Sequence, residues 1–408
     1  MSVAQTQARA PVIASHDAAV AVAGAFGLQI SDGVHERDRD GSLPVEELAE
    51  LDRSGLLAIT VPRRHGGSGL GCVTLAEVAR SIAAIDPAIA QAAQGHFLFV
   101  DVLSVFGSVE QQRMLFADVL AGARIANALA ERGGPHAQDL QTQLVRSGSQ
   151  PGVASLTGRK YYATGALTAH WIAVTALDDE GDLVLAFVQR EADGVELDHD
   201  WDVMGQRATV SGGVTLEHVV VDPRLVLSYG EFFEVPQQFG ARAQLYHAAI
   251  QVGIAGGALR DAQAYVTTKA RPFFEAAKAG WAPTAAEDPH TIHRFGQLAT
   301  RVRAAEVLLR DTAATLDEIG LVPQDPESAA RGSIAVAQLK AFASEIAVSV
   351  ASDIFALTGA SAANRKYDLD RHWRNARTHA SHDPVDWKYH HVGNFLLNGV
   401  FPPNHGQL

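Results

Sequence analysis

The chain has 408 residues, 47% of them hydrophobic and 19% charged, and this length and composition predict a folded protein of two or three packed units. Its formal net charge of -13 argues against the basic surface that nucleic-acid binding requires, so we expect no nucleic-acid partner. The single cysteine, Cys72, excludes an internal disulfide and fits a reducing cytoplasm. The apolar run at residues 18–28 is too short to span a bilayer and has no basic cluster before it, so we expect no membrane segment.

The first 125 residues are predicted to be mainly helical. Apolar residues recur at helical spacing in residues 44–57 and 74–85, and residues 18–28 form an alanine-rich stretch typical of a first helix. We therefore expect an N-terminal helical domain over residues 1–125.

The pattern changes after Gly133 to short runs rich in β-branched and aromatic residues, separated by glycine and aspartate turns. These runs cover residues 140–145, 154–162, 171–177, 183–189 and 214–221. They predict a central β domain over residues 126–232.

Helical spacing returns from Gln244 and continues in two further long stretches, around residues 298–316 and 346–357. Gly253, Gly256 and Gly257 each weaken a helix by about 1 kcal/mol relative to alanine, so we expect another helix to approach closely there. Residues 233–408 are therefore predicted to form a helical bundle with a histidine-rich tail.

Histidines are dense near the C-terminus. They are His372, His379, His382, His390, His391 and His405. None of them belongs to an HExxH or facial-triad pattern, and His379 and His382 stand three apart without a partner carboxylate motif, so we expect no metal site.

Asp383 and Pro384 together are typical of a helix start, with the carboxylate as N-cap and proline at the first helical position. This interpretation places His379 and His382 in the loop before a helix N-terminus, where the helix dipole disfavours the charged imidazolium. Neutral imidazoles there could transfer a proton, although each histidine taken alone also fits a structural role.

Four residues suggest cofactor contacts when they are considered together. Asn127 and Thr164 are hydrogen-bonding side chains beside apolar runs, although both also fit turns bonded to the backbone. Trp201 offers a stacking face but could be a core residue. Arg271, before a proline, fits a phosphate contact or a helix C-cap equally well.

Several longer strings resemble one known family over nearly the whole chain. They are Asp200-Trp201 with Met204-Gly205-Gln206-Arg207, Asp288-Pro289-His290-Thr291-Ile292, the run from Trp373 to His379, His382-Asp383-Pro384-Val385, and Leu397-Asn398-Gly399. They resemble the flavin monooxygenase branch of the acyl-CoA dehydrogenase fold, which includes dibenzothiophene monooxygenase and sulfur-acquisition oxidoreductases. The resemblance implies an α+β fold with an N-terminal helical domain, a central β-barrel-like domain and a C-terminal four-helix bundle.

The same resemblance implies a reaction and its partners. Reduced FMN, or alternatively FAD, would come from a separate NAD(P)H-dependent flavin reductase and react with O2 to give a C4a-hydroperoxide. The substrate would be a small molecule, preferably an organosulfur compound, with nitrogen or aromatic hydroxylation as alternatives. The bundle would assemble a homotetramer.

The resemblance also carries roles to individual residues. It places His96, His379 and His382 on the oxygen and substrate side of the flavin. It places Asn127, Thr164 and Trp201 on the isoalloxazine, and Arg271 on the flavin phosphate.

A true acyl-CoA dehydrogenase on the same scaffold is the main alternative. That reaction needs a glutamate base, which the resemblance places near Asp383. An aspartate is one methylene shorter, and as an N-cap it would be poorly placed to take a proton. A non-enzymatic scaffold would leave the histidines unexplained. The sequence therefore favours the monooxygenase.

Overall fold

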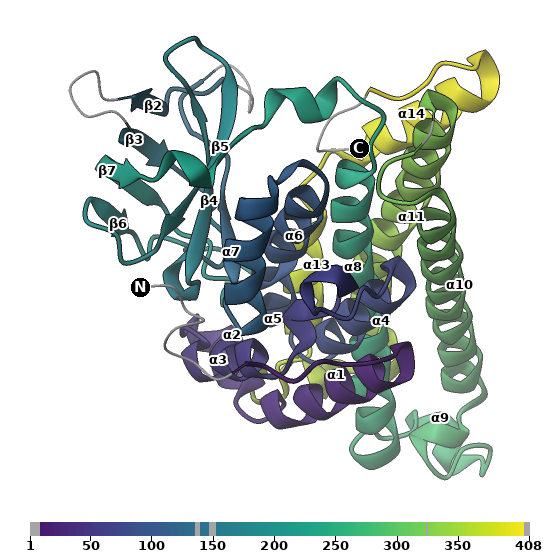
Figure 1. The fold of residues 1–408 in the computed structure, drawn as a ribbon. Helices are drawn as coiled ribbons and strands as arrows, with labels where there is room; N and C mark the ends of the chain where they lie inside the picture. Colours follow the sequence, from purple (N-terminus) through teal and green to yellow (C-terminus); the bar gives the residue numbers. More distant parts are fainter. Residues whose placement is uncertain (1–8, 135–138, 147–151, 324, 404–408) are drawn as a thin grey trace.

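The computed structural model describes residues 9–134, 139–146, 152–323 and 325–403. His405 lies outside these ranges. Figure 1 shows the strands gathered on one side of the molecule, the first helices of the chain below them, and the long C-terminal helices on the opposite side. The helix α8 (Phe239–Thr268) runs through the middle and adjoins both helical parts.

Three of the described N-terminal helices begin at residues whose side chains cap them. The side chain of Ser15 accepts from the amide of Ala18, and that of Asp86 accepts from the amides of Ala88 and Ile89. Ser108 forms a capping box with Gln111. The helices are α1 (His16–Ile30), α2 (Val34–Asp40), α3 (Val45–Arg53), α4 (Cys72–Ala83), α5 (Pro87–Ala92), α6 (Gln94–Phe106) and α7 (Val109–Leu120).

The central strands form one eight-stranded sheet of the order β6-β7-β3-β2-β4-β5-β8, with β1 paired in parallel to β4. Its path is open among the described pairings. Alternating or continuous apolar residues on β4 and β5 are buried because helices cover this part of the sheet. The strands are β1 (Ile125–Ala128), β2 (Gln143–Arg146), β3 (Ala154–Lys160), β4 (Trp171–Leu177), β5 (Leu183–Gln189), β6 (Val195–Leu197), β7 (Val214–Val221) and β8 (Val226–Ser228).

The C-terminal helices pack around α11, which contacts α8, α10, α13 and α14. Proline follows the N-cap aspartate at the start of both α10 and α11, which fixes where these long helices begin. The helices are α8 (Phe239–Thr268), α9 (Phe274–Lys278), α10 (Pro289–Ile319), α11 (Pro326–Asp353), α12 (Phe355–Thr358), α13 (Asp370–Ala380) and α14 (Val385–Asn398).

Two of the three glycines of α8 lie at a close helix contact, as their sequence predicts. A Cβ atom on Gly253 would lie 2.6 Å from the carbonyl oxygen of Arg80, and one on Gly257 would lie 2.4 Å from that of Ala84. These glycines let α8 approach the end of α4. The prediction is wrong for Gly256, whose Cβ would meet no atom within 4 Å.

Two helical stretches are long and apolar enough to cross a membrane by those criteria alone, residues 87–106 and 326–358. Within the fold, 72% and 67% of their apolar windows are buried. Burial of this kind is typical of the core helices of a folded domain.

Candidate active site

Asn127 and Trp201 of the β domain both contact Tyr162. The side-chain nitrogen of Asn127 donates to the Tyr162 carbonyl over 3.4 Å, and the Tyr162 ring packs edge-on against Trp201 at 6.0 Å. Tyr162 has a positive φ of 55°, which L residues rarely adopt. The side-chain oxygen of Asn127 is buried and has no hydrogen-bond partner among the described residues.

Thr164 belongs to the same network through a chain of hydroxyl groups. Its Oγ1 lies 2.8 Å from the Ser211 hydroxyl, which lies 2.7 Å from that of Thr209. Thr209 Oγ1 and Trp201 Nε1 both donate to the carbonyl of Gln206, over 3.0 and 2.9 Å. The structure therefore brings the three predicted flavin contacts of the β domain into one network.

Gln206 connects this network to the C-terminal helices. Its side-chain nitrogen lies 3.4 Å from Nδ1 of His379, and its own side-chain oxygen is buried without a partner among the described residues. A buried oxygen of this kind is costly unless a ligand or water bonds it. The position suits a ligand between the β domain and the bundle.

Three imidazole rings, those of His247, His379 and His382, lie together beyond Gln206 and form the imidazole row of the site. His247 of α8 places Nδ1 3.3 Å from Nε2 of His379, and its ring packs 4.4 Å from that of His382 at 37°. His247 and His379 are buried, whereas the side chain of His382 is 46% exposed. The two predicted catalytic histidines of this segment are therefore joined by a third that the sequence analysis did not single out.

Burial is the main reason why two of these rings are neutral. It lowers the pKa of both His247 and His379 well below the usual value, and nearby positive charge, including that of Lys340, adds to the effect. The predicted cause was different. His379 lies in the last turn of α13, at a helix C-terminus, so a helix N-terminal dipole is not what keeps it neutral.

Asp383 does not cap α14, contrary to the prediction. The helix has Pro384 at its N-cap position and no side-chain cap bond. The Asp383 carboxylate instead accepts from Nδ1 of His382 over 2.9 Å and lies 3.7 Å from the Lys340 ammonium. The prediction was wrong because the carboxylate bonds the adjacent His382 and faces Lys340 of α11, and it makes no cap bond to the first turn of α14.

His96 is completely buried on α6, behind Asn127. Its Nε2 bonds to the Leu57 carbonyl over 2.8 Å, and its Nδ1 accepts from the Ile125 amide over 3.2 Å. Burial lowers its pKa to about 4. Since both ring nitrogens are bonded to backbone, His96 holds α6 against β1 and thereby fixes the strand that carries Asn127.

Arg271 is not near the other predicted cofactor residues within one chain. It is exposed after the end of α8, and the distance along that helix from His247 to Thr268 is about 30 Å. Figure 1 shows α9, which follows Arg271, at the far end of the molecule from the strands.

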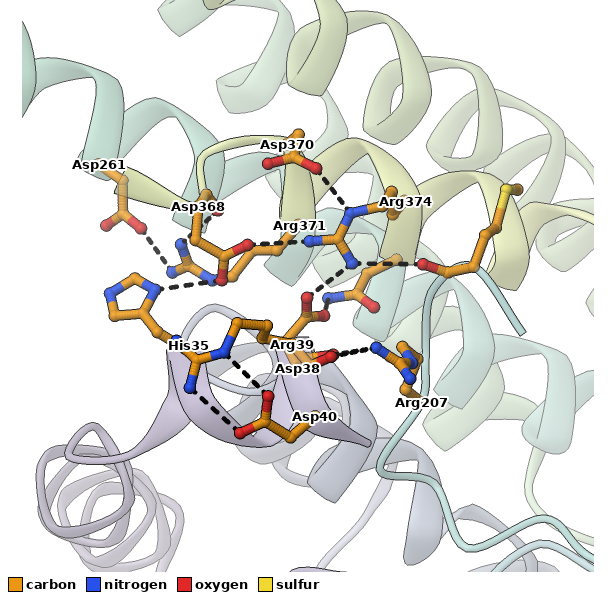
Figure 2. A network of polar contacts seen from close by, with 12 residues as sticks. His35, Asp38, Arg39, Asp40, Arg207, Asp261, Asp368, Asp370, Arg371 and Arg374 are labelled. Atoms are coloured by element: carbon orange, nitrogen blue, oxygen red, sulfur yellow. Dashed lines mark hydrogen bonds and ion pairs between the residues drawn. The ribbon is translucent and has the colours of Figure 1, made fainter. Parts of the chain in front are cut away.

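A polar network fixes the turn that carries Gln206. Arg374 of α13 binds the carboxylates of Asp38 and Asp368 over 2.6 and 2.9 Å (Figure 2). Its guanidinium also donates to the Met204 carbonyl over 3.2 Å. A Cβ atom on Gly205 would lie 2.2 Å from the Arg374 carbonyl, so only glycine allows this approach.

Asn375 of α13 connects the same turn to the N-terminal helices. Its side-chain oxygen accepts from the Gln206 amide over 2.5 Å, while its nitrogen donates to Asp38 over 3.1 Å. Gln206 adopts a positive φ of 56°. The shared Met204-Gly205-Gln206-Arg207 and Trp373–His379 strings therefore contact each other.

Sequence reasoning missed Gln206, His247 and Lys340. One available signal was the polar spacing of Gln244, His247 and Gln251, which places three polar side chains on one stripe of an otherwise apolar helix. All three are buried, and the side chains of Gln244 and Gln251 each have one atom without a hydrogen-bond partner among the described residues.

Two other features do not define the site. A surface hollow of about 1080 Å³ lies along α10, lined by residues that include His290, His293 and Arg301. It is open, and its lining includes none of the three imidazole rings. Among the described residues, no three His, Cys, Asp or Glu side chains are arranged to hold a metal ion.

The fold is that of the acyl-CoA dehydrogenases. Residues 18–123 match the acyl-CoA dehydrogenase N-terminal domain, and residues 245–387 match the acyl-CoA dehydrogenase C-terminal domain. These two regions contain the N-terminal helices and most of the C-terminal bundle, and the strands lie between them.

The sequence relatives narrow this class. Dibenzothiophene monooxygenase from Rhodococcus erythropolis is 32% identical over 390 residues, covering 90% of each chain. The probable FMNH2-dependent monooxygenase SfnC from Pseudomonas putida is 30% identical and covers 96% of this chain and 98% of its own. FMN-bound TdsC from Paenibacillus sp. A11-2 superimposes with a TM-score of 0.90 at 30% identity, over 96% of this chain and all of the TdsC chain. The chain belongs to the flavin-dependent monooxygenase family of the acyl-CoA dehydrogenase fold, together with the dibenzothiophene monooxygenases.

Proposed function

We propose that this chain is a two-component monooxygenase that uses reduced FMN and O2 to oxidise a small organosulfur compound. The family supports this proposal, because its named members include a dibenzothiophene monooxygenase and a probable FMNH2-dependent enzyme. A separate NAD(P)H-dependent reductase would supply the reduced flavin. The observation that carries the proposal is the convergence of the β-domain network and the imidazole row on Gln206.

The residues present fit a flavin. An isoalloxazine edge offers both hydrogen-bond donors and acceptors, and the unpartnered buried oxygens of Asn127 and Gln206 are acceptors of this kind, next to the hydroxyl of Thr164 and the ring of Trp201. When bound, reduced flavin supplies the electrons with which O2 is divided between the product and water. FAD stays an alternative, because the part of a flavin beyond its ring is not constrained by these residues.

The chain's own residues position the reacting groups and hold or move the protons of the reaction. His247 and His379 are buried and neutral, so they can hold or move a proton without adding a buried positive charge. His382 reaches water and adjoins His247, so it can exchange that proton with solvent. His96 acts behind them, because its ring nitrogens are already bonded to backbone.

The structure argues against the dehydrogenase alternative. Burial would raise the pKa of Asp383, but the hydrogen bond from His382 and the positive charges of Lys340 and Lys388 hold it well below its usual range. Such a carboxylate is a weak base, and it already bonds His382.

We also propose that the active enzyme is a homotetramer in which Arg271 binds the flavin phosphate of another copy. Exposed Arg271 is too far along α8 to reach the other predicted flavin contacts of its own chain. The apolar, glycine-containing helices of the bundle would supply the contact between copies.

A cytoplasmic location fits the one cysteine, which is buried and has a pKa raised to about 12 by burial.

Oxygen uptake tests the proposed reaction. The protein is mixed with a flavin reductase, FMN, NADH and a panel of thioethers, sulfones, sulfinates, amines and indoles, and product and hydrogen peroxide are measured together. We expect sulfur oxidation in step with O2 uptake. Oxygen-independent reduction of an electron acceptor by an acyl-CoA, with no product from the panel, would establish the dehydrogenase instead.

A further inference from the structure

A buried ion pair lies behind the imidazole row and has no role in the mechanism described so far. Lys340 of α11 and Asp383 have side chains only 1% and 2% exposed, with 3.7 Å between Nζ and Oδ2. Neither atom has a hydrogen-bond partner among the described residues. A buried pair with such geometry is weak as a stabilising contact, because desolvation offsets much of the attraction.

The other carboxylate oxygen explains what the pair does. Asp383 Oδ1 lies 2.9 Å from Nδ1 of His382, the residue next to it in sequence. Because the carboxylate is ionised, it can only accept, so the hydrogen of a neutral His382 ring is held on Nδ1 and Nε2 keeps its lone pair. The carboxylate thus determines both the tautomer and the orientation of this ring.

The hydrogen bonds also indicate the tautomers of the other two rings. If the Gln206 amide donates to Nδ1 of His379, then His379 carries its hydrogen on Nε2 and donates it to Nδ1 of His247. The charged groups that face these rings are Lys340 of α11 and Lys388 of α14, with Asp383 as the carboxylate. Lys340 is therefore one of two buried cations that oppose protonation of the imidazoles.

We propose that Lys340 is a positioning residue of the monooxygenase reaction, which through Asp383 holds the hydrogen of the His382 ring on Nδ1 and opposes the addition of a second proton to that ring. The ammonium shares the carboxylate with His382 and so weakens the attraction of that carboxylate for an imidazolium. Burial lowers the pKa of Lys340 to about 8, which leaves the side chain mostly charged at neutral pH. The catalytic consequence rests on the function proposed above, whereas the state of His382 can be measured without flavin.

The first test measures His382 in flavin-free protein. Diethyl pyrocarbonate acylates neutral imidazole, and the rate at His382 can be followed by mass spectrometry from pH 5 to 9. In Lys340→Met the charge is lost at similar length, so we expect modification of His382 at pH 7 to slow about threefold or more and its midpoint to move to higher pH. An unchanged profile in a folded Lys340→Met variant would overturn the proposal.

A double-mutant comparison tests whether Lys340 acts through Asp383. In an Asp383→Asn background, Lys340→Met should change the His382 profile much less than it does in the natural protein. An equal change in both backgrounds would mean that Lys340 acts independently of the carboxylate and would contradict the proposal. The double variant also loses both buried charges, so it provides a folded comparison if either single variant is unstable.

A second buried lysine provides a matched control. Lys160 pairs with Glu131 over 2.6 Å in the β domain, away from the imidazole row. Lys160→Met should lower thermal stability but leave the His382 profile unchanged. In the complete enzyme, Lys340→Met should move the acidic limb of product coupling to higher pH, and Lys340→Arg should restore part of it. If the natural protein proves inactive as a monooxygenase, only this last readout fails, and the modification data still decide the role of Lys340.

Discussion

The side-chain nitrogen of Gln206 lies 3.4 Å from Nδ1 of His379, so one hydrogen bond joins the β-domain network to the imidazole row of the helices. The turn that carries Gln206 packs directly against α13, which carries His379. The two halves of the site can therefore be separated by a change that touches neither predicted flavin contact nor histidine.

Gly205→Ala is such a change. Its Cβ would lie 2.2 Å from the Arg374 carbonyl and would push the turn away from α13, at a cost of about 1–3 kcal/mol in the free energy of unfolding. We expect weaker FMN binding, measured by flavin fluorescence, and a lower product yield. Gly256→Ala is the control, because its Cβ meets no atom within 4 Å and alanine favours a helix; equal losses in both variants would contradict this explanation.

His382→Ala should uncouple the reaction rather than abolish cofactor binding. Loss of the solvent-reaching imidazole should reduce the product rate on the order of a hundredfold, while O2 uptake continues and hydrogen peroxide accumulates. The ratio of product to peroxide and the FMN affinity are the measurements. A fully coupled His382→Ala enzyme would remove this residue from proton transfer.

Asp383→Asn should cost more stability than the loss of a helix cap. It leaves the Lys340 ammonium buried beside a neutral amide, and breaking a buried pair typically costs about 3 kcal/mol or more, against about 1 kcal/mol for an N-cap. Urea unfolding of the single variant and of Asp383→Asn with Lys340→Met distinguishes these cases. The second substitution should recover part of the loss if the ion pair is responsible.

Stability should fall in mild acid because several histidines are buried as neutral rings. The folded-state pKa of His96 and His372 is lowered to about 4 by burial, from an ordinary value of 6.5. The unfolded chain therefore binds protons below pH 6.5 that the folded chain does not, and each residue should remove about 3 kcal/mol of stability between pH 6.5 and 4. Urea unfolding at pH 7 and pH 5 measures this slope.

His96→Gln tests the assignment of that slope. Glutamine does not titrate but can still donate to the Leu57 carbonyl, so the difference in stability between pH 7 and pH 5 should become smaller. His293→Gln, a change of an exposed ring on α10, should leave the slope as it is. The same slope in all three proteins would mean that other groups dominate acid unfolding.

Mixed oligomers test the proposed role of Arg271. Arg271→Gln and Asn127→Ala should each weaken FMN binding, by about tenfold for loss of a charge-assisted hydrogen bond to phosphate. If Arg271 serves another copy, co-assembled chains of the two variants contain some sites with both residues intact and regain binding. Co-assembly without recovery would mean that the residues act within one chain or not at the flavin, and light scattering gives the oligomeric state in parallel.

The sequence predicted elements well where a pattern is long and local. The strands β4, β5 and β7 have the predicted bounds, because each is a continuous or alternating apolar run between turns. The short strands β6 and β8 were missed, since three residues carry too little pattern to distinguish them from loops.

The site was predictable only through residue types that are unusual in their local setting. Asn127, Thr164 and Trp201 were found in that way, and the structure joins them. Lys340 looks like an ordinary charged residue of a long helix until α14 and Asp383 are packed against it. His247 likewise depends on the approach of α13, which no local pattern indicates.

Asn375 links parts of the chain that are far apart in sequence, so that the position of one depends on the position of the other. Its side-chain nitrogen donates to Asp38 of α2, 337 residues away, and its side-chain oxygen accepts from the backbone amide of Gln206. A substitution on the outer surface of α2 that shifts Asp38 would thus alter how the β domain is set against the bundle. Variants selected for a different substrate need not change any residue that touches it, and random mutagenesis for new specificity should recover α2 as well as the residues around the histidines.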